Sequence, residues 1–168
     1  MEIVSDGTNW KILHYDSIFA YAKHTETSGT NGGSSTANTV QTRTINNLTG
    51  DTGFASIATN QITLVPGTYE IIGFSEAYEV SRHQVFLYSI TGSTYDLDGT
   101  SVVVALDGTS TSSNISGQII VTSTEVFELR HWTQGTKATT GLGFAADNHA
   151  SNPQSNEVYA QLKITKIR

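Results

Sequence analysis

Cysteine is absent from this chain of 168 residues, and only 14% of the residues are charged. Disulfide bonds, cysteine-based zinc sites and thiol nucleophiles are therefore excluded. The nine Lys and Arg residues are outnumbered by 15 Asp and Glu residues, and they do not form the basic stripe that neutralises nucleic-acid phosphates. No apolar run approaches the roughly 20 residues of a transmembrane helix, and the first residues lack the pattern of a signal peptide.

Strong helix formers are also scarce, whereas Thr, Ser and Gly fill much of the chain. Thr is β-branched and favours strands, and Gly, Ser and Asn favour turns. Disorder is the alternative for such a composition, but Val, Ile, Phe, Tyr and Leu recur in clusters of strand length. The sequence therefore predicts an all-β protein.

Residues 1–16 form a distinct piece in this pattern. The Asp6-Gly7 turn signal separates two short apolar runs, which is typical of a β-hairpin. A two-stranded hairpin is marginal in water, so we expect Trp10 to pack on another part of the protein. The remaining residues, 17–168, form one predicted domain.

The predicted domain begins with residues 18–25, which fit a helical turn or a strand, and whose aromatic residues favour a strand. Residues 26–39 are of low complexity and predict a mobile loop. Residues 40–46 alternate as an edge strand does, and two strands are expected around the Pro66-Gly67 turn. Further strands are expected at 82–90, 101–108, 116–122, 125–133 and 158–167. About ten short strands at this spacing indicate an antiparallel two-sheet jelly roll or a related sandwich.

The strand after Pro66 is apolar on both faces. Alternation places Tyr69, Ile71 and Ala77 on one face, and the other face carries Ile72, Phe74, Tyr78 and Val80. An antiparallel strand in a monomer normally keeps one wet face. The pattern therefore predicts that another subunit covers the second face.

An ordered series of short motifs carries a family resemblance over residues 18–168. The motifs are PGTYEI (66–71), RHQVFLYSIT (82–91), SGQIIVTST (116–124), FELRH (127–131), TGLGFA (140–145) and EVYAQLKITKI (157–167). This series resembles the C-terminal head module of bacteriophage tail fibres, which is similar in fold to the globular head of complement and to tumour necrosis factor. The resemblance implies a ten-strand jelly roll that assembles as a homotrimer.

The resemblance also implies a function. It makes the chain a receptor-binding head at the tip of a tail fibre on the virion, which attaches to a bacterial surface molecule such as a glycan or an outer-membrane component. Residues 1–16 would then be the end of the fibre shaft or a linker hairpin. Two alternatives stay open: a trimeric capsid decoration or head-fibre protein, and a polysaccharide depolymerase.

Motifs for catalysis are missing. Residues 73–77 fail the GxSxG pattern at the last position, and neither HExxH nor a phosphate-cradling glycine motif occurs. Asp96 and Asp98 lie in a predicted loop. Their Asp-x-Asp-Gly motif is a weak signal for calcium binding, because the rest of the twelve-residue calcium-binding loop is missing. The sequence therefore predicts no catalytic residue, metal site or cofactor.

Two Arg-His pairs, at 82–83 and 130–131, lie inside predicted strands. Alternation places His131 on the same face as Phe127 and Leu129. We therefore expect buried, hydrogen-bonded histidines in the core or at a subunit contact. Copies of a histidine around a three-fold axis could alternatively hold a metal.

Receptor contacts are expected in connections that carry aromatic or acidic side chains. The candidates are Tyr95, Asp96, Asp98, Trp132, Asn148 and His149. A buried structural role is an equal alternative for Trp132.

Overall fold

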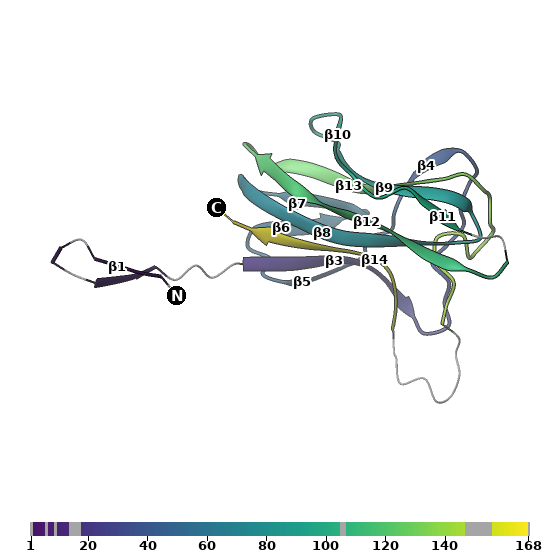
Figure 1. Cartoon of the computed structure of the whole chain (residues 1–168), viewed down its shortest axis with the longest axis horizontal. Coiled ribbons are helices and arrows are strands. Elements are labelled where there is room, and N and C mark those ends of the chain that lie inside the picture. The colour runs from purple at the N-terminus through teal and green to yellow at the C-terminus, as the bar shows by residue number, and fades with distance from the viewer. Residues whose placement is uncertain are drawn as a thin grey trace.

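The computed structural model describes residues 2–5, 7–8, 10–13, 18–104, 107–146 and 156–167. Two antiparallel sheets face each other in a sandwich, and a separate two-stranded hairpin precedes them (Figure 1). This architecture confirms the prediction of an all-β, two-sheet sandwich. The described residues contain no helix that could cross a membrane.

The five-stranded sheet has the order β12-β8-β14-β3-β5. Its strands are β12 (Ser110–Val121), β8 (Gly67–Tyr78), β14 (Asn156–Lys166), β3 (Ile18–Thr27) and β5 (Asn47–Gly50). Ile18 at the start of β3 pairs with Lys166 at the end of β14, so the domain is entered and left at the same end of this sheet.

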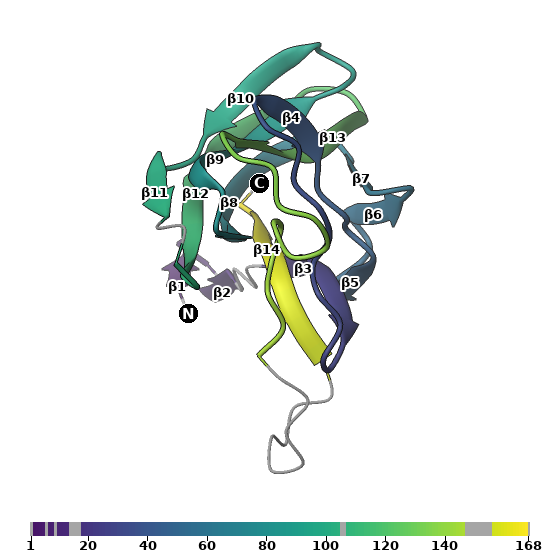
Figure 2. The same cartoon turned by 90° about the vertical axis from the view of Figure 1, so that its right-hand side faces the viewer.

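The seven-stranded sheet has the path β10-β9-β13-β7-β6, with β11 paired to β9 and β4 paired to β13. Its strands are β10 (Thr94–Asp98), β9 (Ser81–Ser89), β13 (Glu125–Thr133), β7 (Gln61–Leu64), β6 (Ala55–Ala58), β11 (Val102–Val104) and β4 (Thr39–Thr42). Figure 2 shows β9, β10, β4 and β13 together above the layer that contains β14 and β3.

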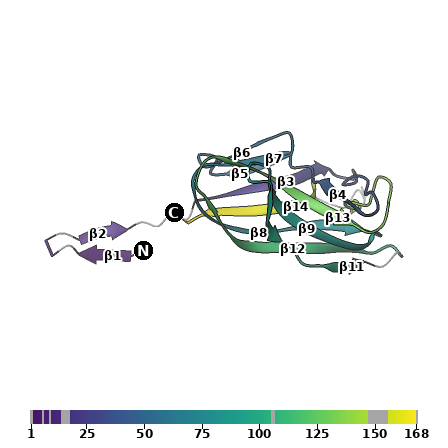
Figure 3. The ribbon, with the colours of Figure 1, turned by 90° about the horizontal axis from the view of Figure 1, so that it is seen from above.

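The N-terminal hairpin consists of β1 (Glu2–Ser5) and β2 (Trp10–Leu13), which pair antiparallel as expected. Figure 3 shows it beyond the end of the sandwich where β14 finishes. The sequence predicts that Trp10 packs on another part of the protein, but the side chain of Trp10 is not among the described parts of the structure.

Most predicted strands are present, including one at 18–25 and an edge strand within 40–46. Two strands flank Pro66 as expected, but β7 and β8 belong to different sheets. The connection at Pro66 therefore crosses between the layers. The described part of the sandwich has twelve strands, whereas about ten were expected. Three short strands, β5, β6 and β10, were not predicted from the sequence.

The low-complexity segment 26–39 is a loop after Thr27, but it is not the unattached loop that its composition predicts. The amide of Gly32 donates to the carbonyl of Gly143 at 2.9 Å, and the amide of Ser35 donates to the carbonyl of Lys137 at 3.0 Å. The backbone satisfies its polar groups against the 134–146 loop, which fixes both loops together.

The core fills the space between the sheets. Along β13, Phe127, Leu129, His131 and Thr133 are buried, and the intervening side chains face outward. The prediction that Phe127 and His131 share the inner face is thus confirmed. Phe127 belongs to one large apolar cluster that joins both sheets.

The assignment of residues to the two faces of β8 is confirmed over most of its length. Tyr69, Ile71 and Ala77 are buried, whereas Ile72 is 49% exposed. The expectation for Val80 is wrong, because this side chain is fully buried beside Ala77. The positive φ of 51° at Glu79 interrupts the strand alternation and turns the chain inward.

Candidate binding groove on the seven-stranded sheet

The outward face of β9 is built by strand alternation. Arg82, Gln84, Phe86 and Tyr88 occupy every second position, and none of them is buried. The residues between them, including Val85, point into the core. These four outward side chains form the central row of the candidate site.

Strand β13 supplies the row on one side. Trp132 is directly opposite Gln84 on β9, and Arg130 is opposite Phe86. Val40 of the edge strand β4 lies on the far side of Trp132 and is directly opposite it. The half-buried indole therefore stands between an apolar edge and an amide side chain.

Strand β10 supplies the row on the other side of β9. The chain 94–98 forms a strand and not the predicted loop, because Tyr95 pairs with Tyr88 and Asp98 pairs with Phe86. The register shifts between Tyr95 and Leu97, so Asp96 is the extra residue of a β-bulge. The bulge places Tyr95 and Asp98 on one face although they are three residues apart.

Two adjacent hollows lie over these rows. The first, the Arg82 hollow, has a volume of about 380 Å³ and is lined by Arg82, His83, Gln84, Ser101, Val102, Val103 and Trp132. The second, the Tyr95 hollow, has a volume of about 300 Å³ and is lined by Val40, Gln84, Phe86, Tyr95, Asp98 and Trp132. They share Gln84 and Trp132 and so form one continuous feature, the outer-sheet groove.

Hydrogen bonds fix the floor of the groove. The Nε2 atom of Gln84 donates to the carbonyl oxygen of Gly99 at 2.9 Å, and the Ser101 hydroxyl donates to Oε1 of Gln84 at 3.2 Å. One amide hydrogen and one lone pair of this side chain remain for a ligand. Gln84 can therefore both donate to and accept from a molecule in the groove.

Aromatic contacts fix the wall beside β10. The rings of Tyr95 and Tyr88 are 4.9 Å apart, and those of Tyr95 and Phe86 are 5.5 Å apart, both edge to face. The Arg130 guanidinium lies 3.4 Å from the centre of the Tyr88 ring, and its Nε donates to Glu128 at 2.9 Å. Such stacking holds Tyr95, which is 50% exposed, in a defined position.

Three of the six candidate contact residues thus meet in one place, since Tyr95, Asp98 and Trp132 line the Tyr95 hollow. Asp96 is exposed on the bulge, where it accepts a hydrogen bond from the Thr94 hydroxyl at 2.6 Å, and it does not line the hollow. Asn148 and His149 lie outside the described residues. The structure gives Trp132 an intermediate position, half-buried and in contact with the groove.

Four residues that line the groove were not predicted as site residues: Arg82, Gln84, Phe86 and Val40. Their outward alternation on strands 82–90 and 40–46 was available in the sequence, but the sequence does not show which strands are neighbours.

The predicted core histidines form a hydrogen-bonded chain under the groove. The Nδ1 atom of His131 lies 3.0 Å from the Ser75 hydroxyl, and its Nε2 lies 2.8 Å from Nδ1 of His83. The Nε2 atom of His83 lies 2.9 Å from the Thr111 hydroxyl. Two neutral rings satisfy all four nitrogens in this chain, so the expectation of hydrogen-bonded core histidines is confirmed.

Burial, together with the nearby Arg43, disfavours protonation of these rings. It lowers the pKa of His83 to about 4 and holds the pKa of His131 well below its ordinary value. Both rings are therefore neutral at pH 7, which is the form that the hydrogen-bonded chain requires.

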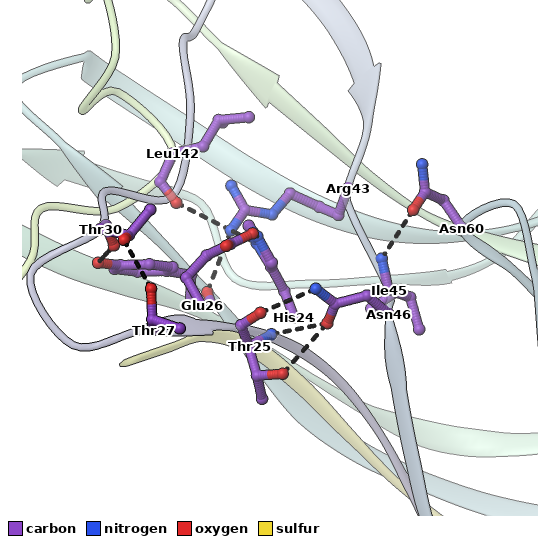
Figure 4. Close-up of polar contacts among 11 residues, drawn as sticks. His24, Thr25, Glu26, Thr27, Thr30, Arg43, Ile45, Asn46, Asn60 and Leu142 are labelled. Carbon is purple, nitrogen blue, oxygen red and sulfur yellow. Dashed lines mark hydrogen bonds and ion pairs between the residues drawn. The ribbon is translucent and has the colours of Figure 1, made fainter. Parts of the chain in front are cut away.

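Among the described residues, Arg43 is the largest fully buried side chain. Its burial was not predicted from the sequence. Its Nη2 donates to the carbonyl oxygen of Leu142 at 2.8 Å and to that of Tyr159 at 3.3 Å, and it lies 3.4 Å from Nδ1 of His24 (Figure 4). Its Nε and Nη1 atoms have no acceptor among the described residues. Burial lowers the pKa of Arg43 to about 9, although Glu76 partly opposes this.

The described residues contain no group of three or more His, Asp or Glu side chains that could hold a metal ion. Asp98 is the single carboxylate among the residues that line the groove. The chemistry available there is stacking on aromatic rings and hydrogen bonding to an amide, a hydroxyl, a carboxylate and a guanidinium.

Comparison with models of known protein families gives no match, and no curated protein matches the sequence. Among solved structures, the chain is similar to the globular domain of the zebrafish complement 1qA protein. The two are 16% identical with a TM-score of 0.53, over 91% of this chain and 98% of the zebrafish domain. Likeness at this level of identity concerns the fold, and it shows that the chain has the jelly-roll fold of the complement globular head.

Proposed function

We propose that the chain is a homotrimeric, non-enzymatic receptor-binding head of a bacteriophage tail fibre, which attaches the virion to a glycan on the bacterial surface. The observation that carries this proposal is the outer-sheet groove, in which Tyr95, Asp98 and Trp132 converge. The motif series of the sequence supports the phage assignment, and the complement-like fold agrees with it.

A glycan fits the chemistry of the groove. Ligand sites combine apolar and aromatic walls with a few polar groups that fix orientation. Trp132 and Tyr95 offer ring faces for the apolar side of a sugar, and Gln84 and Asp98 offer partners for its hydroxyls. The hydrogen bonds of Gln84 hold its amide in place before a ligand arrives, which reduces the ordering cost of binding.

A binding role is favoured over glycoside cleavage by the carboxylate content of the groove. Most glycosidases need two carboxyl groups on opposite sides of the scissile bond. The described lining supplies one, Asp98. Attachment without cleavage is the function that this lining supports.

The outward face of the five-stranded sheet supports the trimer. Ile120 is 71% exposed and Ile72 is 49% exposed, and Phe19 also lies on this face. Large exposed apolar side chains on one surface are typical of a protein interface. Because the groove lies on the other sheet, three subunits packed through this face keep three free grooves, whose joint action strengthens weak single contacts.

Light scattering tests the assembly. We expect a mass three times that of the 18.1 kDa chain at micromolar concentration, because an obligate interface of this kind buries a few thousand Å². Ile72→Asp should give monomers, since a charge would enter the interface. The matched control is Val103→Asp, at a site that is 72% exposed on the other sheet, and it should remain trimeric. A monomeric wild-type protein would contradict the proposal.

Cell binding tests the groove. We expect Tyr95→Ala combined with Asp98→Asn to weaken attachment to bacteria severalfold, amplified by its presence in three subunits. Loss of the Tyr95 ring contacts with Tyr88 and Phe86 should cost on the order of 1 kcal/mol, so the melting temperature should fall by only a few degrees and the fold should be kept. The measurement is binding of labelled protein to those bacteria that wild-type protein labels, together with competition against phage adsorption.

Asp96→Asn is the matched control, because Asp96 lies in the same strand but outside the lining of the groove. Equal losses in the control and the double variant would remove the groove from the receptor site. A wild-type protein that bound phage capsids and no bacteria would favour a capsid decoration protein.

A further inference from the structure

We infer that the Arg82 hollow is a subsite for an acidic sugar unit, whose carboxylate or phosphate group binds the Arg82 guanidinium while its ring lies against Trp132. This inference rests on the proposed glycan binding and specifies the ligand class.

The composition of the hollow supports an anionic substituent. Arg82, Ser101 and Gln84 supply the polar groups, and Val102, Val103 and Trp132 supply the apolar wall. Arg82 is opposite Val103 of β11, and Trp132 projects from the other neighbour of β9. A guanidinium therefore stands at the rim, next to a hydroxyl and an indole.

Arg82 also differs from the other two described arginines in its partners. Arg130 is paired with Glu128 and stacked on Tyr88, and Arg43 is buried against carbonyl oxygens. Within the described part of the chain, the exposed Arg82 side chain has neither an ion pair nor an aromatic partner. Its planar, two-pronged donor set is free for carboxylate or phosphate oxygens, which it matches in geometry.

The two hollows of the groove carry charged side chains of opposite sign. Arg82 lines only the first hollow, Asp98 lines only the second, and Gln84 lies in both. An anionic sugar unit is attracted to the Arg82 hollow and repelled from the Tyr95 hollow. A neutral neighbouring unit suits the Tyr95 hollow, where Asp98 accepts hydrogen bonds from hydroxyls. The groove thus favours an acidic oligosaccharide in one orientation.

Titration of the trimer with small sugars tests the subsite. The probes are digalacturonic acid, its methyl ester, and galactose 6-phosphate, and the readout is the indole N–H resonance of Trp132. The chain has two tryptophans, and Trp132→Phe assigns this signal. We expect the acid to bind about fivefold more tightly than the ester at low salt, the advantage of an exposed ion pair at its upper limit. Screening at high salt should reduce this preference.

Arg82→Gln should abolish the preference for the acid, because it lowers the affinity for the acid more than that for the ester, whereas Asp98→Asn should retain the preference. Tighter binding of galactose 6-phosphate than of the acid would assign the subsite to phosphorylated sugars. Equal affinity for acid and ester in the wild type, a preference that survives Arg82→Gln, or no shift with any probe would each overturn the inference. The proposed function is judged separately, by cell attachment of the Tyr95→Ala/Asp98→Asn variant.

Discussion

Replacement of Phe127 by Ala is expected to lower the free energy of unfolding by about 3 to 5 kcal/mol. Phe127 is 1% exposed and belongs to the apolar cluster that joins the two sheets. Its removal loses the transfer free energy of the ring and leaves a cavity between two rigid layers. Chemical denaturation at a fixed protein concentration measures the loss, since unfolding of an oligomer depends on concentration.

Val126→Ala is the control for this experiment. The neighbouring side chain faces outward from β13 and is only half-buried, so its truncation should cost about 1 kcal/mol or less. Similar losses for the two variants would contradict the placement of the core. Phe127→Ala should also lose cell attachment, because the groove depends on the position of β13.

Acidification from pH 7 to pH 4 is expected to destabilise the protein strongly. In the unfolded chain each histidine takes up a proton near its ordinary pKa of 6.5, whereas burial holds the pKa of His83 at about 4 in the folded protein. As the pH falls from 6.5 to 4, the unfolded state binds protons that the folded state does not bind. The contribution of His83 to stability is therefore complete above pH 6.5, and about 3 kcal/mol of it is lost by pH 4.

His131 adds to this loss, because burial also lowers its pKa. The exposed ion pair of Glu79 with Lys137 acts in a lower range, since it lowers the pKa of Glu79 below its ordinary value of 4.5. That contribution is present above pH 4.5 and disappears as pH falls below it. Burial raises the pKa of Glu76 above its ordinary value of 4.5, so protonation of Glu76 in the folded state opposes part of the loss. A comparison of the wild type with a variant of His83 therefore isolates the contribution of that histidine.

Thermal unfolding at a series of pH values checks this expectation. His83→Gln keeps a donor and an acceptor beside His131 and Thr111, whose hydroxyl lies 2.9 Å from the His83 ring, but it has no proton to gain. Its melting temperature should fall less than that of the wild type between pH 6.5 and pH 5. Parallel curves for the two proteins would contradict the lowered pKa of His83 in the folded protein.

The long strands could be predicted from the sequence because their signals are local. Strands β8, β9, β13 and β14 combine β-branched or aromatic residues with alternation over nine or more residues. The short strands β5 and β10 were missed, because NLTG and TYDLD have the composition of turns. Those segments are strands because long neighbours offer them hydrogen-bond partners, which no local pattern reveals.

The candidate site was predictable as single residues but not as a constellation. Tyr95, Asp98 and Trp132 were identified by their chemistry, yet their convergence requires the bulge at Asp96 and the register of β9 with two neighbours. Arg43 shows the same limit: its burial depends on the carbonyl oxygens of Leu142 and Tyr159, which are distant in sequence.

The pairing of Ile18 with Lys166 makes the sandwich a transplantable unit. Its entry and exit are neighbours on adjacent strands, so the segment between them can be grafted into a loop of another protein without stretching the host. The groove on the seven-stranded sheet would travel with it unchanged, because none of its residues lies on β3 or β14. The apolar face around Ile72 and Ile120 would travel as well, so a graft that carries Ile72→Asp would let a recipient scaffold of known oligomeric state set how many grooves are displayed.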